Sequence, residues 1–137
     1  MNIFIDTGPL YAFFDQNDQH NRWTGEQFAK LTQPLITCEA VIAETVFLML
    51  GTGIDPDKLF EFAQREHLQI LPVLEKPETL ERIREIINTY SNLPASFADA
   101  CLVHMTENRP RSKILTLDNH FTIYRTSEGK PLSLIFP

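Results

Sequence analysis

Acidic residues that could do chemistry stand at four places in the sequence. Asp6, Asp99 and Asp118 each lie at a junction between predicted elements, whereas Glu44 lies inside a strongly apolar helical stretch. Carboxylates are the ligands that hard divalent cations such as Mg²⁺ prefer, and several carboxylates in one place repel one another unless a cation neutralises them. If the fold brings these four residues together, their chemistry is that of a divalent-metal site.

Each aspartate also has a purely structural interpretation. Asp6 and Asp118 each follow a predicted strand and precede predicted helical residues, where aspartate is a common N-cap. Asp99 comes three residues after Ser96, at the N3 position of a helix start that resembles a capping box. Capping alone therefore accounts for any single aspartate as well as metal binding does.

Capping does not explain Glu44. Its neighbours three and four positions away along a helix are all apolar, so its carboxylate is predicted to leave from the apolar stripe; they are Ala40, Val41, Phe47 and Leu48. A lone buried carboxylate costs on the order of several kcal/mol unless it is paired, protonated or bound to a cation. Two partners stay open for Glu44: an arginine in a buried salt bridge, or a metal ion.

Short apolar runs that alternate with helical patterns predict an α/β fold. The expected strands are 2–5, 34–37, 68–74, 113–117 and 132–136, and the expected helices are 9–14, 23–31, 39–50, one that starts at 55–57, 77–90 and 96–107. Strands separated by helices imply a mostly parallel central sheet flanked by helices on both faces. Ligands in such folds bind beyond the carboxyl ends of the strands, where Asp6 and Asp118 are predicted to lie.

Length and composition predict a single domain over residues 1–137. Of the 137 residues, 43% are hydrophobic and 22% are charged, which is typical of globular proteins and not of disordered chains. The longest apolar stretch, 41–50, is about half of the ~20 residues that a membrane-spanning helix needs, and the first residues do not form a secretory signal. We therefore expect a cytoplasmic protein, without a membrane partner, in which Cys38 and Cys101 are reduced and buried.

The charge balance is unfavourable for simple nucleic-acid binding, because the net charge is −6 and the pI is about 5.1. The densest basic cluster is Arg109, Arg111 and Lys113, and we expect it at the far end of the sheet, about 16 Å from Asp118 at ~3.3 Å per residue. Arg125 is the better candidate for contacting a substrate phosphate, with a solvated charge as the alternative.

These features favour a phosphodiester hydrolase that depends on Mg²⁺ or Mn²⁺, since a bound metal lowers the pKa of water and screens the charge of the attacked phosphate. Two alternatives remain. A phosphohydrolase with Asp6 as its nucleophile would usually have a second acid two residues later, where this chain has Gly8. A non-catalytic RNA-binding or protein-interaction module on the same fold would not need all four carboxylates.

The sequence resembles the PIN-domain ribonucleases, a family that includes the toxins of VapBC toxin–antitoxin pairs. The matching segments span nearly the whole chain in family order: Ile5-Asp6-Thr7-Gly8-Pro9-Leu10, Val41-Ile42-Ala43-Glu44-Thr45, Phe97-Ala98-Asp99-Ala100 and Thr116-Leu117-Asp118-Asn119-His120-Phe121. The resemblance implies an α/β nuclease fold whose metal site consists of Asp6, Glu44, Asp99 and Asp118. It also implies that neighbouring polar residues orient the acids or the substrate; these are Thr7, Thr116 and Asn119.

The same resemblance implies an endoribonuclease that cleaves RNA, forms a homodimer and has an antitoxin-like partner. The apolar residues of the Leu59–Ala63 region exceed what one small domain obviously needs to bury, which agrees with self-association. Many relatives carry an acid two residues after the last metal aspartate, where this chain has His120. This difference leaves a second metal site open and favours either single-metal occupancy or a softer ion such as Mn²⁺.

Overall fold

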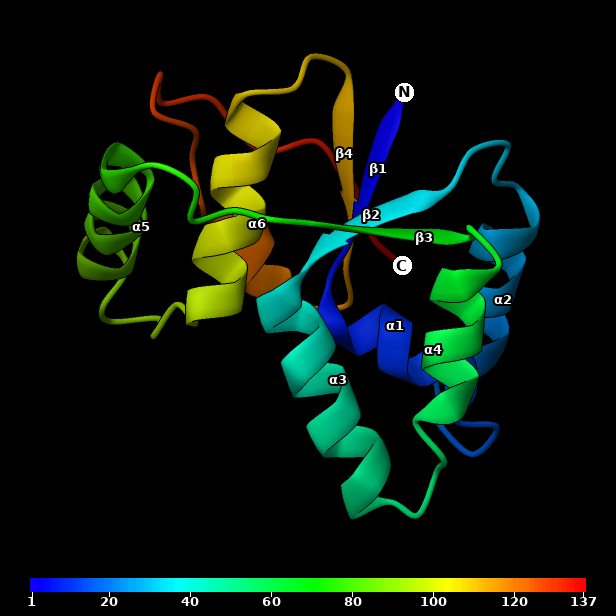
Figure 1. Ribbon diagram of the computed structural model, residues 1–137. Coiled ribbons are helices and arrows are strands. Elements are labelled where there is room, and N and C mark those ends of the chain that lie inside the picture. The colour runs from blue at the N-terminus through cyan, green and yellow to red at the C-terminus, as the bar shows by residue number, and fades with distance from the viewer.

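The computed structural model describes residues 1–137, and its elements follow the order predicted from the sequence (Figure 1). The strands are β1 (Asn2–Ile5), β2 (Leu35–Cys38), β3 (Leu68–Leu71), β4 (Ser112–Leu115) and β5 (Leu134–Ile135). The α-helices are α1 (Thr7–Phe14), α2 (Asn21–Ala29), α3 (Glu39–Gly51), α4 (Asp57–Gln64), α5 (Pro77–Thr89) and α6 (Phe97–Glu107), and a short 3₁₀ helix, η1 (Asn119–Thr122), follows β4.

The differences from the predicted bounds have local causes. Strand β3 ends at Leu71 instead of residue 74, because Pro72 follows it and has no N–H to donate to the ladder. Helix α1 begins at Thr7, two residues earlier than predicted, because the Asp6 side chain accepts a hydrogen bond from the Thr7 N–H and caps the helix. The element types themselves are confirmed.

All five strands are parallel, in the order β3-β2-β1-β4-β5. From β1 the chain adds β2 and then β3 on one side of β1. It then crosses back over β2 and β1 and adds β4 on the other side of β1. Because such crossovers are right-handed, the two directions place their helices on opposite faces of the sheet. Figure 1 shows α5 and α6 on one side of the strands and α2 and α4 on the other. The predicted α/β fold with helices on both faces is confirmed.

The strand order reverses between β1 and β4, and this is the point where ligands bind in parallel sheets. The two strands are paired through the register Ile5↔Leu115, and the Asp6 N–H donates to the Leu115 carbonyl at 3.0 Å. Asp6 directly follows β1, and Asp118 comes shortly after β4. Both aspartates therefore lie at the carboxyl end of the sheet, as predicted.

Helix α6 forms the centre of the core. Its buried side chains include Ala98, Ala100, Cys101, Leu102 and Val103. A helix that is apolar on nearly every side must be covered on every side, and α6 packs between the sheet and α5. The first turn of this helix carries Asp99. Asp99 therefore has a rigid support.

Helix α3 differs from its prediction. Its buried side chains are Val41, Thr45 and Met49, which recur every four residues, while Glu44 is exposed and Phe47 is 76% exposed. The prediction that Glu44 leaves from a buried stripe is wrong, because the apolar stripe around it faces outward. The helix is apolar on nearly all sides, so the spacing of its apolar residues does not distinguish the core face from the outer one.

The Leu59–Ala63 region also differs from its prediction, because most of its apolar side chains are used inside the domain. Leu59 is fully buried, and the Phe62 ring stacks on Phe28 with 5.9 Å between ring centroids. Only Phe60 is markedly exposed, at 42%. The region therefore has no large apolar surplus, and the larger exposed apolar side chains lie on α3.

Two smaller predictions can be compared with the structure. Cys38 and Cys101 are both buried and free, as predicted. None of the helices combines the length and the apolar character that crossing a membrane requires.

Candidate active site

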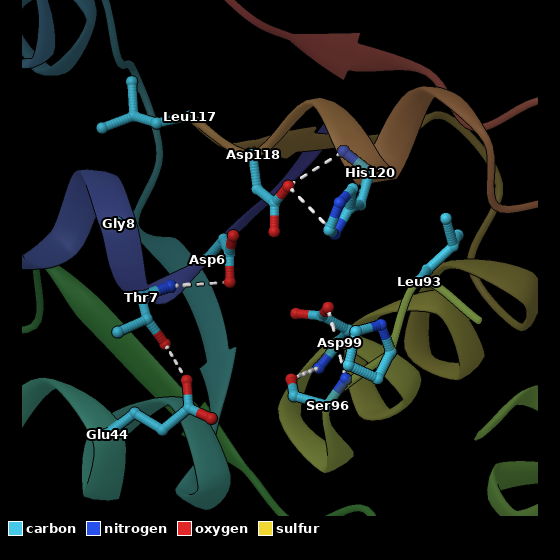
Figure 2. A pocket seen from close by; sticks show the side chains of 11 residues that line it. Asp6, Thr7, Gly8, Glu44, Leu93, Ser96, Asp99, Leu117, Asp118 and His120 are labelled. Atoms are coloured by element: carbon cyan, nitrogen blue, oxygen red, sulfur yellow. Dashed lines mark hydrogen bonds and ion pairs between the residues drawn. The ribbon is translucent and has the colours of Figure 1, made fainter. Parts of the chain in front are cut away.

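A cavity of about 460 Å³ opens at the carboxyl end of the sheet, and all four predicted acids line it (Figure 2). Asp6 comes from the end of β1, Glu44 from α3, Asp99 from α6 and Asp118 from the segment after β4. The lining contains no lysine or arginine. Residues that are far apart in the sequence therefore form one strongly acidic cavity.

Asp6 is the most firmly held of the four acids. One carboxylate oxygen accepts the Thr7 N–H at 2.8 Å, and the other accepts the Thr116 hydroxyl at 2.9 Å. The Thr116 oxygen in turn accepts the N–H of Asp118 at 3.0 Å. Thr116 thereby joins the two aspartates that follow β1 and β4, and Asp6 is only 6% exposed.

Asp99 is held by a capping box and by a tyrosine. The Ser96 hydroxyl accepts the Asp99 N–H at 3.0 Å, and the Asp99 carboxylate accepts the Ser96 N–H at 3.5 Å. The hydroxyl of Tyr124, which is completely buried, donates to the same carboxylate oxygen at 2.8 Å. Sequence reasoning missed Tyr124, because no pattern in the sequence relates it to Asp99, which lies 25 positions earlier.

Asp118 is more open to solvent. Its carboxylate caps η1 by accepting the His120 N–H at 2.9 Å, and the imidazole Nδ1 of His120 lies 3.5 Å from the same oxygen. About 40% of the Asp118 side chain is exposed. The three aspartates thus have the predicted capping roles and also line the cavity. Each carboxylate offers about four acceptor positions, so capping leaves room for a cation.

Glu44 reaches the cavity from its edge. Its carboxylate accepts the Thr7 hydroxyl at 2.8 Å and has no salt bridge to an arginine, so that alternative is wrong. Thr7 therefore links Glu44 to Asp6 through its hydroxyl and its N–H. Figure 2 shows Asp6, Asp99 and Asp118 around one space, with Glu44 beyond Thr7.

The structure does not bring Asn119, a predicted supporting residue, or Arg125, the predicted phosphate contact, into the cavity. Asn119 is exposed and its side chain makes no hydrogen bond within the chain. The Arg125 guanidinium instead donates at 2.9 Å to three nearby backbone carbonyls, those of Thr122, Ile123 and Tyr124. Arg125 therefore stabilises the end of η1.

The buried acids resist ionisation. Burial, together with the charges of Asp99 and Asp118, raises the pKa of Asp6 to about 7, although the hydrogen bonds from Thr116 and Thr7 lower it. Burial also raises the pKa of Asp99, although the Tyr124 hydrogen bond acts in the opposite direction. A cation in the cavity would remove both penalties, because an opposite charge favours the ionised carboxylate.

The donor set fits a hard divalent cation, since carboxylate oxygens are the preferred ligands of Mg²⁺ and also bind Mn²⁺. No three histidine, cysteine or acidic side chains stand close enough together to surround a metal ion in their present positions. Mg²⁺ usually keeps several waters and takes only one or two protein carboxylates. The open cavity is compatible with that mode of binding.

The sequence of residues 3–126 matches the family model of the PIN domain. The chain belongs to the PIN domain family. Among solved structures, this PIN domain is similar to VapC20 of Mycobacterium tuberculosis, a toxin that cleaves the sarcin–ricin loop. The TM-score is 0.77 at 19% sequence identity, and the match covers 95% of this chain and 100% of VapC20. No curated protein matches the chain. The resemblance expected from the sequence is confirmed at the level of family and fold.

Proposed function

We propose that this PIN domain is a divalent-metal-dependent endoribonuclease. The proposal rests on one observation: four carboxylates from four separate segments line a single cavity that contains no lysine or arginine. A protein that only bound RNA would gain nothing from such a cavity, because its charge repels phosphate. A cation that binds both the carboxylates and the phosphate gives the arrangement a use.

Asp6, Asp99 and Asp118 would hold the cation, with Glu44 at the edge of the cavity. A divalent cation supplies Lewis-acid chemistry, which polarises a phosphoryl oxygen and makes water more acidic. The chain itself fixes the acids: Thr116 holds Asp6 beside Asp118, and Tyr124 holds one oxygen of Asp99. Their orientation is thus set before substrate arrives.

The proposed reaction is hydrolysis. The oxygen of a water molecule joins the phosphorus, and the bond from phosphorus to the 3′ oxygen breaks, which leaves a 5′-phosphate and a 3′-hydroxyl. The alternative route through the 2′-hydroxyl usually needs two groups that exchange protons, and His120 is the only histidine in the lining. A 2′,3′-cyclic phosphate is therefore not the expected product.

We further infer that the domain acts as a toxin with an antitoxin-like protein partner and that it forms a homodimer in the cytoplasm. Large apolar side chains are exposed on α3, beside the edge of the cavity where Glu44 lies; they are Phe47, Leu48 and Leu50. Exposed apolar patches of this kind favour a protein partner. A partner bound there would also restrain a ribonuclease that endangers its own cell.

The alternative with Asp6 as the nucleophile of a phosphohydrolase has less support. Both Asp6 oxygens already accept hydrogen bonds, and the side chain is almost fully buried. Burial also raises its pKa to about 7, so a large fraction of the carboxyl is protonated near neutral pH. Gly8 provides no second acid. Asp6 is therefore better suited to hold a cation than to attack phosphorus.

The direct test is incubation of the purified protein with several classes of RNA in Mg²⁺, in Mn²⁺ or in EDTA. We expect cleavage that needs the metal and leaves 3′-hydroxyl ends, and a single 2′-deoxy substitution at the cleaved nucleotide should still permit it. Undiminished cleavage in EDTA would contradict the metal requirement. Absence of cleavage with every RNA class would favour the binding module.

A further inference from the structure

The acidic cavity raises the question of how this protein holds RNA. The chain has a net charge of −6, and the cavity contributes four carboxylates and no basic side chain. Phosphate contacts from lysine and arginine supply most of the affinity of proteins for nucleic acids. If the proposed function is correct, the affinity for RNA must come largely from another part of the surface.

Unpaired cations gather at the opposite end of the sheet. Five basic side chains lie just before, or at the start of, strands that begin there, and none of the five forms an ion pair; they are Lys30, Arg65, Arg109, Arg111 and Lys113. Of the seven other basic side chains, four are paired with glutamates, Arg22, Arg82, Arg84 and Lys130, and three form no ion pair, Lys58, Lys76 and Arg125. We call the five unpaired residues, together with the amino group of Met1, the amino-edge surface.

The centre of this surface is the turn between α6 and β4, which carries three of the cations. Arg109 and Arg111 are exposed, and Lys113 is half-buried. Figure 1 shows this turn at the same end of the sheet as the N-terminus. The N–H of Asn2 donates to the Arg111 carbonyl at 2.9 Å, which joins the turn to the start of β1.

The turn is held in a strained conformation. Arg111 has a φ of 56°, in the left-handed region that residues other than glycine rarely adopt. Two more carbonyls of the turn are also bonded, Pro110 by the Asn2 side chain at 3.2 Å and Arg109 by the Ser112 hydroxyl at 2.6 Å. Strain of this kind persists only where the surroundings impose it, and it concentrates at functional sites. Here it fixes the backbone that presents two exposed guanidinium groups.

The next cations along the edge extend the surface. Lys30 follows α2 and, together with Met1 and Gln33, lines a hollow of about 200 Å³ between the starts of β1 and β2. Arg65 comes shortly before β3, beyond β2 in the sheet. The positive groups therefore extend along the edge from the start of β3 to the start of β4.

We propose that the amino-edge surface binds the phosphate backbone of the RNA that the acidic cavity cleaves. Seven residues separate Arg111 from Asp118, which corresponds to about 23 Å at ~3.3 Å per residue of extended chain. A nucleic-acid strand stacked as in B-form DNA, at ~3.4 Å per nucleotide, covers this distance in about seven nucleotides, and A-form RNA, which rises less per nucleotide, needs at least as many. An RNA that contacts both the amino-edge surface and the cavity must therefore be longer than a few stacked nucleotides, so the proposal predicts a preference for longer RNA over short oligonucleotides.

The test measures RNA binding by fluorescence anisotropy in protein that carries Asp6→Asn, so that no cleavage occurs. The ligands are a fluorescent stem-loop RNA of about 25 nucleotides and a fluorescent RNA of four nucleotides, which is shorter than the ~7-nucleotide span. The variant is Arg109→Ala/Arg111→Ala/Lys113→Ala. The matched control, Arg22→Ala/Lys58→Ala/Arg84→Ala, removes the same charge from exposed positions on α2, α4 and α5.

We expect the turn variant to bind the stem-loop about 10-fold or more weakly than the control variant. We also expect the slope of log affinity against log salt to become shallower by about 2, at ~0.7 per lost phosphate contact. The difference between the two variants should shrink for the four-nucleotide RNA. The variant Arg109→Gln/Lys113→Gln keeps Arg111 and its strained backbone, and it should lose RNA affinity to an intermediate extent. It therefore distinguishes the effect of lost charge from the effect of a misfolded turn.

Equal affinities and equal salt slopes for the turn and control variants would overturn the proposal. So would a turn variant that binds RNA normally but loses binding to polyglutamate, because the surface would then serve an acidic protein. The proposed catalytic function fails separately, if the wild-type protein cleaves no RNA in Mg²⁺ or Mn²⁺. Binding that depends on the turn would stand in that case, as the surface of an RNA-binding module.

Discussion

The two sides of the candidate active site are built differently. Asp6 and Asp99 form its buried side, where Thr116 and Tyr124 hold the carboxylates and burial raises the pKa of both acids. Asp118 and Glu44 form its open side, where the side chains are partly or largely exposed. If the proposed function is correct, the buried side would fix the position of a cation, while the open side would adjust to the cation and the substrate.

Substitution of the acids should have the largest effect. Asp6→Asn, Asp99→Asn, Asp118→Asn and Glu44→Gln keep the side-chain volume and remove the charge that a cation needs, so each should lower RNA cleavage by orders of magnitude, on the order of 10²-fold or more. We expect the losses on the buried side to exceed those on the open side. Cleavage rates and thermal melts of the four variants provide the measurement.

Asp99→Asn distinguishes the two roles of that residue. Full activity with a lower melting temperature would mean that Asp99 serves only as the capping partner of Ser96. Loss of activity with a small change in melting temperature would assign it to the cation.

Tyr124→Phe should have the next largest effect. It removes only the hydroxyl that donates to Asp99 and leaves the ring in its place against Phe121 and Tyr90. Loss of a residue that orients a metal ligand typically costs 10–100-fold in metal affinity, so we expect about 10-fold weaker binding of Mn²⁺ by calorimetry. Tyr90→Phe is the matched control, because the Tyr90 hydroxyl accepts a bond from the Arg125 N–H and does not contact an acid. Equal Mn²⁺ affinities in the two variants would remove Tyr124 from the site.

The raised pKa of Asp6 makes the stability of the metal-free protein depend on pH. The unfolded chain loses this proton near pH 3.8, whereas the folded chain keeps it up to about pH 7. The folded state therefore binds more protons across that window, and the contribution of Asp6 to stability falls as the pH rises through it. Between pH 4.5 and pH 7.5 the loss is on the order of 3 kcal/mol, at ~1.4 kcal/mol per unit of pKa. Urea melts in EDTA at pH 4.5 and pH 7.5 should show this fall in the wild type, and a smaller one in Asp6→Asn.

His120→Ala should have the smallest effect. The imidazole lies near Asp118 on the open side, but the proposed hydrolysis does not require a histidine. We expect a decrease in cleavage of about 10-fold or less, well below the ~10²–10⁴-fold that general acid–base groups contribute. A cyclic phosphate as the first product of the wild type, together with complete loss of activity in His120→Ala, would replace hydrolysis with attack by the 2′-hydroxyl.

The comparison of the two sides also shows how far the sequence alone reaches. The order and type of the elements follow from local patterns, and the positions of Asp6 and Asp118 follow from the rule that ligands bind at the carboxyl ends of parallel strands. These features depend on short segments and on chain topology, both of which the sequence displays. The positions of Asp6 and Asp118, one on each side of the cavity, were therefore predictable.

The remaining features depend on contacts between distant segments. The outward face of α3 was not predictable, because a helix that is apolar on nearly every side gives no signal for its core face. The bond from Tyr124 to Asp99 joins residues 25 positions apart, and neither residue type nor spacing indicates it. The strained Arg111 backbone likewise results from bonds to the start of β1.

The most direct test of the central claim is a calorimetric titration of the apo protein with Mn²⁺ at pH 6, in two buffers that differ in ionisation enthalpy. A cation held by the carboxylates must displace the proton that Asp6 retains below a pKa of about 7. The wild type should bind Mn²⁺ at pH 6 and release up to about one proton per ion. At pH 8 it should release fewer protons. Asp6→Asn should bind Mn²⁺ far more weakly. Absence of Mn²⁺ binding by the wild type, or equal binding and proton release in Asp6→Asn, would contradict the account.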